Sequence, residues 1–329
     1  MNDGSGTGQL PEGHRSGFVT IFGRSNVGKS TLMNRLVGSK VAIVTDVPQT
    51  TRRRVRGIRT YDDAQIVYMD TPGVHKPRYA MNRRMVATAI ASLDGVDLVL
   101  LLVDAGDGLG RGDEFVMDVA RERVVPVFLI INKVDLITHD KLLVLIGEAT
   151  AQRSFAEVVP VSALKGDNVQ RLESLIRKKL PPGPRYFPEG TLTDAPEKFL
   201  MAEILREKII LNTRQELPHA TAVIIERQEE GANGILEMDA LMFVDRESQK
   251  GILIGKGGAT MKKIASQARH EMEERLGTKV FLQTWVKVAR DWRMDPRILD
   301  QMGVEGEIRE DSPPAKPSRK KRSRPTRSR

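Results

Sequence analysis

The sequence predicts an α/β domain with a mixed, mostly parallel sheet and helices on both faces, followed by a smaller α+β domain. Between residues 17 and 180, strand-like runs alternate with amphipathic stretches, which is typical of a parallel sheet covered by helices. Residues 181–196 contain five prolines and indicate a linker. Beyond the linker the order becomes helix–strand–strand–helix–helix–strand, which is too short for a second domain of the first kind.

The elements follow from apolar runs and from amphipathic periodicity. In the first domain we expect strands at residues 17–22, 55–60, 64–70, 97–104, 125–132 and 158–161. Its helices are expected at residues 31–36, 82–93, 113–121, 142–150 and 169–180. In the second domain we expect a helix at 197–212, strands at 220–226, 235–244 and 278–288, and two helical segments that meet at 255–258, the second over 261–276.

Composition limits the chemistry and the partners. The chain has no cysteine, which excludes disulfides and thiolate chemistry, and its apolar runs are too short to span a bilayer. The net charge is +9, and residues 313–329 supply eight positive charges and no acid, which leaves +1 for residues 1–312. We divide the chain into a disordered tail without a signal peptide (1–16), the first domain (17–180), the linker (181–196), the second domain (197–303) and a disordered basic tail (304–329). A cytoplasmic monomer is expected.

A phosphate-binding loop carries the strongest functional signal. Residues 23–30 (GRSNVGKS) match the pattern G-x-x-x-x-G-K-[ST] between a predicted strand and a predicted helix. Gly23 and Gly28 allow successive N–H groups to point at phosphate oxygens. Lys29 is expected to reach the β- and γ-phosphates, and the Ser30 hydroxyl to bind Mg²⁺. The other nucleotide-binding residues of this segment are Ser25, Asn26, Val27 and Thr31.

Two further segments are expected at the γ-phosphate and the metal. The first follows the strand at 64–70 and consists of Asp70, Thr71, Pro72 and Gly73. Asp70 can hold Mg²⁺ through water, and the Gly73 N–H can contact the γ-phosphate. In the second segment (PQTTR, 48–52) a threonine can complete the Mg²⁺ shell; we favour Thr51, with Thr50 as the alternative. Catalysis is expected to depend on Lys29, Thr51 and Gly73.

The residues that determine specificity for the nucleotide base follow the predicted strands at 125–132 and 158–161. The Asp135 carboxylate can accept hydrogen bonds from N1–H and the 2-amino group of guanine, a pairing that adenine lacks. Asn132 can tie the base loop to the phosphate loop, and the stem of Lys133 can lie over the purine ring. GTP and GDP are therefore the predicted ligands in preference to ATP.

A short segment after the strand at 158–161 completes the base site. Its residues are Ser162, Ala163 and Leu164. The backbone N–H of Ala163 can donate a hydrogen bond to guanine O6.

These segments resemble the Era family of bacterial GTPases. The resemblance is carried by GRSNVGKST, PQTTRRR, DTPGVHKP, NKVD and VSAL, and it continues through FLMAEILREK, ELP, RESQKGILIGKGG and VKVARDWR, so that it covers roughly residues 17–303. It implies a Ras-like GTPase domain followed by a type II K-homology (KH) domain. It also implies a protein that binds the 3′ end of 16S ribosomal RNA and assists assembly of the 30S subunit.

Hydrolysis departs from the Ras pattern. Val74 stands where Ras-like enzymes carry a glutamine that orients the attacking water, so the catalytic group must come from elsewhere or hydrolysis is slow. The resemblance implies K⁺ as a substitute for an arginine finger, with Asn26 as a ligand; stabilisation of the loop by Asn26 is the alternative. We expect Arg24 and Arg52–Arg54 to form a charged face rather than a finger, and His75 to be structural or mobile.

A glycine loop in the second domain indicates RNA binding. It lies between two predicted helices, after two strands and before a third, which is the arrangement of a KH domain. Such a loop clamps the backbone of about four nucleotides. The candidate RNA-binding residues are Gly255, Lys256, Gly257 and Gly258. Trp285 is expected in the core, and Trp292 is open between core packing and base stacking.

The motifs and the resemblance leave two possible functions. The leading one is a GTP-hydrolysing switch that binds ribosomal RNA. The alternative is a GTP-dependent regulator at the inner membrane surface, with a cell-cycle or signalling role, in which the basic tail associates with anionic lipid. For the tail itself, a solubilising extension and an RNA-binding arm are both open.

Overall fold

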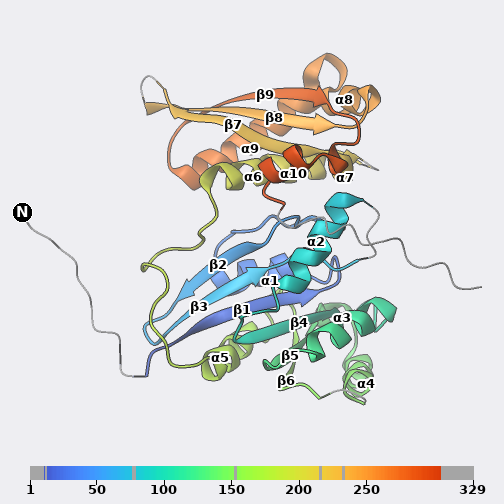
Figure 1. The fold of residues 1–329 in the computed structure, drawn as a ribbon, viewed down its shortest axis with the longest axis vertical. Coiled ribbons are helices and arrows are strands. Elements are labelled where there is room, and N and C mark those ends of the chain that lie inside the picture. The colour runs from blue at the N-terminus through green and yellow to red at the C-terminus, as the bar shows by residue number, and fades with distance from the viewer. Residues whose placement is uncertain are drawn as a thin grey trace, which may run out of the picture.

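The structure, a computed structural model, describes residue 11 and residues 13–75, 79–151, 154–214, 217–231 and 234–304. The first domain is built on a six-stranded sheet in the order β2-β3-β1-β4-β5-β6 (Figure 1). Its strands are β1 (Arg15–Gly23), β2 (Val55–Thr60), β3 (Ala64–Asp70), β4 (Leu98–Asp104), β5 (Val127–Asn132) and β6 (Glu157–Val161). Only the β2–β3 pair is antiparallel among these, so the predicted mixed, mostly parallel sheet is confirmed.

Helices cover both faces of this sheet. They are α1 (Lys29–Val37), α2 (Ala80–Ala91), α3 (Arg111–Arg121), α4 (His139–Thr150) and α5 (Val169–Lys179), with a short helix η1 at Val134–Leu136. Side chains of α1 and α5 share one core with alternate strand residues such as Ile21 and Leu100. The next strand residues, Phe22 and Leu101, point to the second core with side chains of α2, α3 and α4. The strands are therefore buried on both faces, as their continuous apolar runs require.

The second domain packs three of its helices against one face of a three-stranded sheet, and a C-terminal helix packs at Ala222 and Phe243 on the other face. Its elements are α6 (Glu197–Asn212), α7 (Leu217–Ala220), β7 (Ala222–Glu230), β8 (Leu236–Val244), α8 (Glu247–Ile254), η3 (Lys256–Gly258), α9 (Ala259–Leu276), β9 (Val280–Val288), η4 (Trp292–Met294) and α10 (Pro296–Gln301). β7 pairs antiparallel and β9 parallel with the central β8. The predicted order of helices and strands is confirmed, while α7, η4 and α10 were not predicted.

The structure contradicts the expectation for Trp285 and decides the open case of Trp292 in favour of the core. Trp285 lies on β9 and is 45% exposed, whereas Trp292 is fully buried and donates its Nε1–H to the carbonyl oxygen of Ala220 at 2.9 Å. The expectation of a core position for Trp285 is wrong because α6, α8 and α9 pack against the opposite face of β9. Along β9 the residues alternate between that covered face and solvent, and Trp285 falls on the solvent side.

The chain between the domains lies along the β2–β3 edge. The Gln65 side chain donates to the Phe187 carbonyl at 2.8 Å and accepts the N–H groups of Tyr186 and Phe187. The Ile58 N–H donates to the Leu192 carbonyl at 2.8 Å. Figure 1 shows α6, α7 and α10 on the side of the second domain that faces the first.

The predicted tails fall largely outside the described residues. At the N-terminus, however, Arg15 and Ser16 already belong to β1, and His14 contacts the Gly183 carbonyl at 2.8 Å. The predicted tail 1–16 is therefore too long by these residues. Most of the tail 304–329 lies beyond the described residues, of which Val304 is the last and is buried. Within the described ranges no helix combines the length and apolar composition needed to cross a membrane.

Candidate nucleotide and RNA sites

The phosphate loop joins β1 to α1 and depends on a close approach at Gly28. This glycine precedes α1 with a φ of 94°, and a Cβ there would lie 2.2 Å from Asn132 Nδ2. Only glycine allows this backbone conformation and this contact. Helix α1 has no side-chain cap, which leaves its first N–H groups available to an anion.

Lys29 is buried at the base of this loop. Its Nζ donates to the carbonyl oxygens of Arg24 at 2.6 Å and Gly23 at 3.2 Å. Burial lowers the pKa of Lys29 to about 8, although the nearby carboxylate of Asp70 acts in the opposite direction. The ammonium is thus held in place by the loop before any phosphate binds.

The three residues expected at Mg²⁺ converge on one point. Ser30 Oγ donates to Asp70 Oδ2 at 2.6 Å, Thr51 Oγ1 lies 3.2 Å from the same oxygen, and the two hydroxyls are 2.9 Å apart. Asp70 is fully buried, and its Oδ1 has no hydrogen-bond partner among the described residues. Burial raises the pKa of Asp70, against the charge of Lys29. Three hard oxygen ligands with one unpartnered carboxylate oxygen fit a small divalent cation.

The alternative threonine points elsewhere. Thr50 Oγ1 donates to the Val47 carbonyl at 2.6 Å and lies 2.6 Å from Thr45 Oγ1. Its hydroxyl is therefore used inside the loop, which favours Thr51 as the metal-facing residue.

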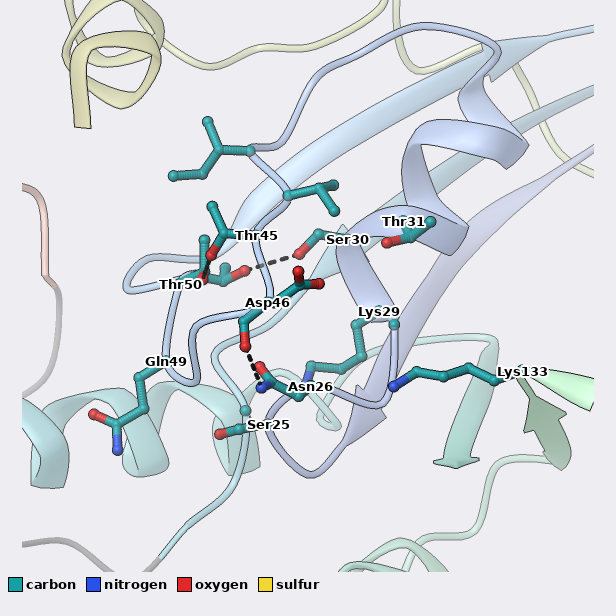
Figure 2. A pocket seen from close by; sticks show the side chains of 15 residues that line it. Ser25, Asn26, Lys29, Ser30, Thr31, Thr45, Asp46, Gln49, Thr50 and Lys133 are labelled. Atoms are coloured by element: carbon teal, nitrogen blue, oxygen red, sulfur yellow. Dashed lines mark hydrogen bonds between the residues drawn. The ribbon is translucent and has the colours of Figure 1, made fainter. Parts of the chain in front are cut away.

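A segment that the sequence did not single out covers the phosphate loop. Residues 43–46 line a cavity of about 240 Å³ together with residues of the phosphate loop, Thr51, Gly73 and Lys133. Figure 2 shows Asn26 beside Asp46, and Asn26 Nδ2 donates to the Asp46 carbonyl at 2.9 Å. Asn26 thus stabilises the covering loop, the alternative role considered for it. Asn34 holds the start of this segment by accepting the N–H groups of Val41 and Ala42.

The base loop is tied to the phosphate loop as predicted. Asn132 Nδ2 donates to the Val27 carbonyl at 2.8 Å, and Asn132 Oδ1 accepts the Ala163 N–H at 3.0 Å. A guanine O6 at this amide would have to share or displace that second bond. Lys133 adopts a φ of 65°, and its Nζ pairs with Asp104 Oδ2 at 2.5 Å.

Asp135 stands apart from the cavity over the phosphate loop. Its side chain is largely buried, and Lys165 Nζ lies 3.9 Å from its Oδ2, too far for a hydrogen bond. Ala163 and Leu164 line a neighbouring hollow with Thr31 and Val44. The structure therefore brings the phosphate and metal residues together and places Ala163 and Leu164 in a second hollow beside them, whereas Asp135 is not among the residues that line either one.

Side chains from other elements hold this second hollow in place. Arg35 of α1, which the sequence did not indicate, donates to the carbonyl oxygens of Ala163 and Leu164. Ser162 is fully buried, and its Oγ accepts the Lys165 N–H at 3.1 Å.

The loop after β3 presses against the phosphate loop. Residues 71–74 are buried, the Thr71 hydroxyl donates to the Ile21 carbonyl at 2.9 Å, and Pro72 lies beside it. A Cβ at Gly73 would lie 2.6 Å from Ser25 Cα, so this contact also requires glycine. Val74 donates its N–H to the Gly23 carbonyl at 3.2 Å and presents no polar side chain to a water.

His75 is structural. Its Nδ1 lies 2.8 Å from the Gly73 carbonyl, which assigns the proton to Nδ1 and makes Nε2 an acceptor. Asn82 Nδ2 then donates to His75 Nε2 at 2.6 Å and to Gln49 Oε1 at 2.9 Å. Through Asn82 the loop after β3 is connected to the segment that contains Thr51.

The arginines near the site do not form one charged face. Arg24 Nε pairs with the buried Asp113 at 2.9 Å. Arg52 is only 6% exposed and donates to carbonyl oxygens of the second domain, so the expectation of a charged switch face is wrong for it. The Arg53 guanidinium lies 4.7 Å from the centre of the Phe199 ring on α6. The sequence could not show the burial of Arg52, because its hydrogen-bond acceptors lie more than 160 positions away in the chain.

The glycine loop of the second domain is a separate, exposed feature. Gly255, Gly257 and Gly258 all have positive φ, and a Cβ at Gly255 would lie 2.2 Å from Thr260 Oγ1. Lys256 and Gly257 are exposed. The loop leads into α9, which has no side-chain cap, so its first N–H groups face outward at the loop.

Two family models match the chain. Residues 18–133 match the model described as 50S ribosome-binding GTPase, and residues 216–293 match the KH domain. The second match covers the exposed glycine loop.

Curated relatives and solved structures match nearly the whole length. The chain is 47% identical to GTPase Era of Heliobacterium modesticaldum and 44% identical to that of Staphylococcus haemolyticus, each over 88% of this chain and 97% of the relative. It is similar to a structure of Era in complex with MgGDPNP and nucleotides 1506–1542 of 16S ribosomal RNA, with a TM-score of 0.86 and 40% identity. A variant of Era from Aquifex aeolicus bound to GDP and AlF₄⁻ matches with a TM-score of 0.85 and 40% identity. Both structural matches cover 88% of this chain and 99% of the other.

Proposed function

Because the chain belongs to the Era family of GTPases, we propose that it is a GTP-dependent switch that binds the 3′ end of 16S ribosomal RNA and assists assembly of the 30S subunit. One observation carries the proposal: the exposed loop Gly255–Gly258 lies at the uncapped start of α9, in the same chain as a complete phosphate loop. A relative of the same fold holds a 16S fragment together with a GTP analogue.

The nucleotide end of the switch follows from the convergent oxygens. We propose that Ser30, Thr51 and Asp70 hold Mg²⁺, directly or through water, and that the ion supplies charge neutralisation at the phosphates. Lys29 adds a fixed positive charge at the β- and γ-phosphates. The Gly73 N–H is proposed to contact the γ-phosphate, so that the loop after β3 responds to its presence.

The remaining assignments at this end concern specificity and hydrolysis. We propose that Asp135 reads the guanine N1–H and 2-amino group, since its carboxylate is largely buried and the Lys165 ammonium stands 3.9 Å away, too far for a hydrogen bond. Val74 cannot orient water, so hydrolysis depends on a group that this position does not supply. We propose Asn26 Oδ1 as a ligand for K⁺ in that role, while its Nδ2 keeps the hydrogen bond to Asp46.

The RNA end of the switch uses backbone and charge. Positive φ at three glycines of the loop brings the main chain to the surface, where phosphates of a single strand can approach it. Lys256 adds an exposed positive charge. Ile252 of α8 is 57% exposed close to the loop and offers an apolar surface for a base.

Binding to a defined RNA tests the proposal. The double variant Lys256→Asp and Gly257→Asp should weaken binding of the GTP-bound protein to an RNA with the 16S 3′ sequence by about tenfold or more, because it places two negative charges at the phosphates. Lys279→Asp is the matched control, since Lys279 is an exposed lysine of the same domain at the start of β9. Equal affinity for the double variant and the wild type would contradict RNA binding at this loop and favour a regulator at the inner membrane.

A further inference from the structure

The residues on both sides of Thr51 contact the second domain. Arg206 of α6 donates from Nη2 to the Thr50 carbonyl at 2.5 Å. On the other side, Arg52 donates from Nη1 to the Thr221 carbonyl at 2.7 Å and from Nη2 to the Pro218 carbonyl at 3.3 Å. The proposed metal-facing residue therefore lies between two contacts that cross the domain boundary.

Both arginines are buried and held by further partners. Arg206 is 2% exposed, and Glu203 fixes its guanidinium with hydrogen bonds at 2.7 Å and 2.6 Å. Arg52 is 6% exposed, and its guanidinium lies 5.6 Å from the centre of the buried Trp292 ring. A buried guanidinium that loses its partners is costly, so these contacts favour one position of the chain at Thr51.

Helix α6 also contacts the start of the same segment. Glu207, the neighbour of Arg206, accepts the Val44 N–H at 3.2 Å and pairs with Lys40 at 2.6 Å. The chain from residue 40 to residue 52 is thus held from the second domain at its beginning and at its end.

We propose that Arg206 and Arg52 are positioning residues that place the Thr51 hydroxyl at Ser30 and Asp70. The inference rests on the proposed role of Thr51 at Mg²⁺. Among the described residues, the Thr51 hydroxyl contacts the side chains of Ser30 and Asp70, and those contacts form only if the backbone from 50 to 52 is in place. The KH domain thereby supplies part of the geometry of the GTPase site. Because such coupling is reciprocal, binding of the γ-phosphate should in turn favour the position of α6 in which Arg206 contacts Thr50.

The variant Arg206→Met tests this role in the full-length protein. It removes the hydrogen bond to Thr50 but keeps most of the volume, and it should lower kcat for GTP about tenfold and raise the Mg²⁺ concentration needed for half-maximal hydrolysis. GDP affinity should stay at the wild-type value, because Thr51 is proposed to act only with the γ-phosphate. Asp300→Ala is the control, since it removes the Arg84 to Asp300 ion pair, which crosses the domain boundary at α2 but includes neither Arg206 nor residues 50–52.

A double-mutant cycle separates positioning from general destabilisation. If Arg206 acts through Thr51, the Thr51→Ala and Arg206→Met double variant should hydrolyse GTP no more slowly than Thr51→Ala alone. Additive losses, or a loss equal to that of Asp300→Ala, would overturn the inference. Glu203→Gln, which loosens Arg206 without removing it, should give a smaller loss of the same kind, and wild-type kcat in both Glu203→Gln and Arg206→Met would also overturn it. If Thr51→Ala itself retained wild-type hydrolysis, the proposed metal role of Thr51 would fail first.

Discussion

Lys29 shows how a single residue is prepared for its ligand. Its ammonium is buried and donates hydrogen bonds to two carbonyl oxygens of its own loop. These oxygens carry partial negative charges but not the full charge of a counter-ion. The lowered pKa reflects this incomplete compensation. A nucleotide phosphate would supply the missing negative charge, so part of the binding free energy comes from relieving a cost already present in the fold.

This cost predicts a pH dependence of nucleotide binding. With a pKa of about 8, Lys29 loses its proton in the free protein as pH rises through that value, whereas phosphates beside it raise its pKa in the complex. GTP affinity should therefore fall above about pH 8, by up to about tenfold per pH unit. Titrations from about pH 7 to about pH 9 check this. A Lys29→Arg variant, which stays charged, should lack the decline; the same decline in both would exclude Lys29 as its source.

Residues differ in how far the sequence could place them. Ser30, Thr51 and Asp70 were predicted to meet because three motifs in order define one strand edge, and the structure brings them within 3.2 Å of each other. The contacts of Arg52 could not be predicted, because its acceptors belong to a different domain. A sequence motif predicts the residues that meet at one loop or strand end. It does not predict whether a charged side chain such as Arg52 is buried, because that depends on a surface formed by the other domain.

At the scale of elements, β9 shows why the alternation of side chains along a strand does not by itself reveal which face lies in the core. Its residues alternate as a half-buried strand should, and Val280 belongs to the covered face. Phe281 and Trp285 occupy the other face and are exposed. The sequence shows the alternation but not which set the helices cover, because the larger side chains lie on the solvent side. The strand was predicted correctly, and the facing of Trp285 was not.

The contact between two loops gives a prediction at the same scale. In Gly73→Ala the new Cβ would meet the backbone of Ser25 at 2.6–2.7 Å, so the loop after β3 must move away from the phosphate loop. GTP hydrolysis should fall by about ten- to a hundredfold, since the Gly73 N–H would be displaced from the γ-phosphate. Single-turnover hydrolysis measures the loss.

Gly147→Ala provides the matched control for this substitution. Gly147 lies inside α4, and a Cβ there would meet nothing within 4 Å. The variant should raise the free energy of unfolding by about 0.5–1 kcal/mol and leave hydrolysis unchanged. If Gly73→Ala hydrolysed GTP at the wild-type rate, the tight contact between the loops would have no role in the reaction.

At the scale of the whole molecule, the charged residues that join the two domains are separate from those that give the chain its net positive charge. The interface between the domains uses buried charged side chains of α6: Arg206, which hydrogen-bonds to Thr50, and Glu207, which pairs with Lys40. The excess positive charge of the chain lies instead in residues 313–329, outside the described residues. The domain order and both functional loops were predictable from sequence, while the way the second domain contacts residues 40–52 required the structure.

The basic tail predicts a salt dependence that belongs to the full chain. If its eight positive charges bind RNA phosphates, deleting residues 313–329 should reduce the slope of log affinity against log salt by at most about 0.7 for each charge engaged. The loop Gly255–Gly258 would keep its own contribution, so binding at low salt should persist. A full-length variant with glutamine at all eight basic positions of the tail keeps the length and should behave like the deletion. Slopes that match the wild type in both would mean that the tail does not contact RNA, which leaves solubility or association with anionic lipid as its role.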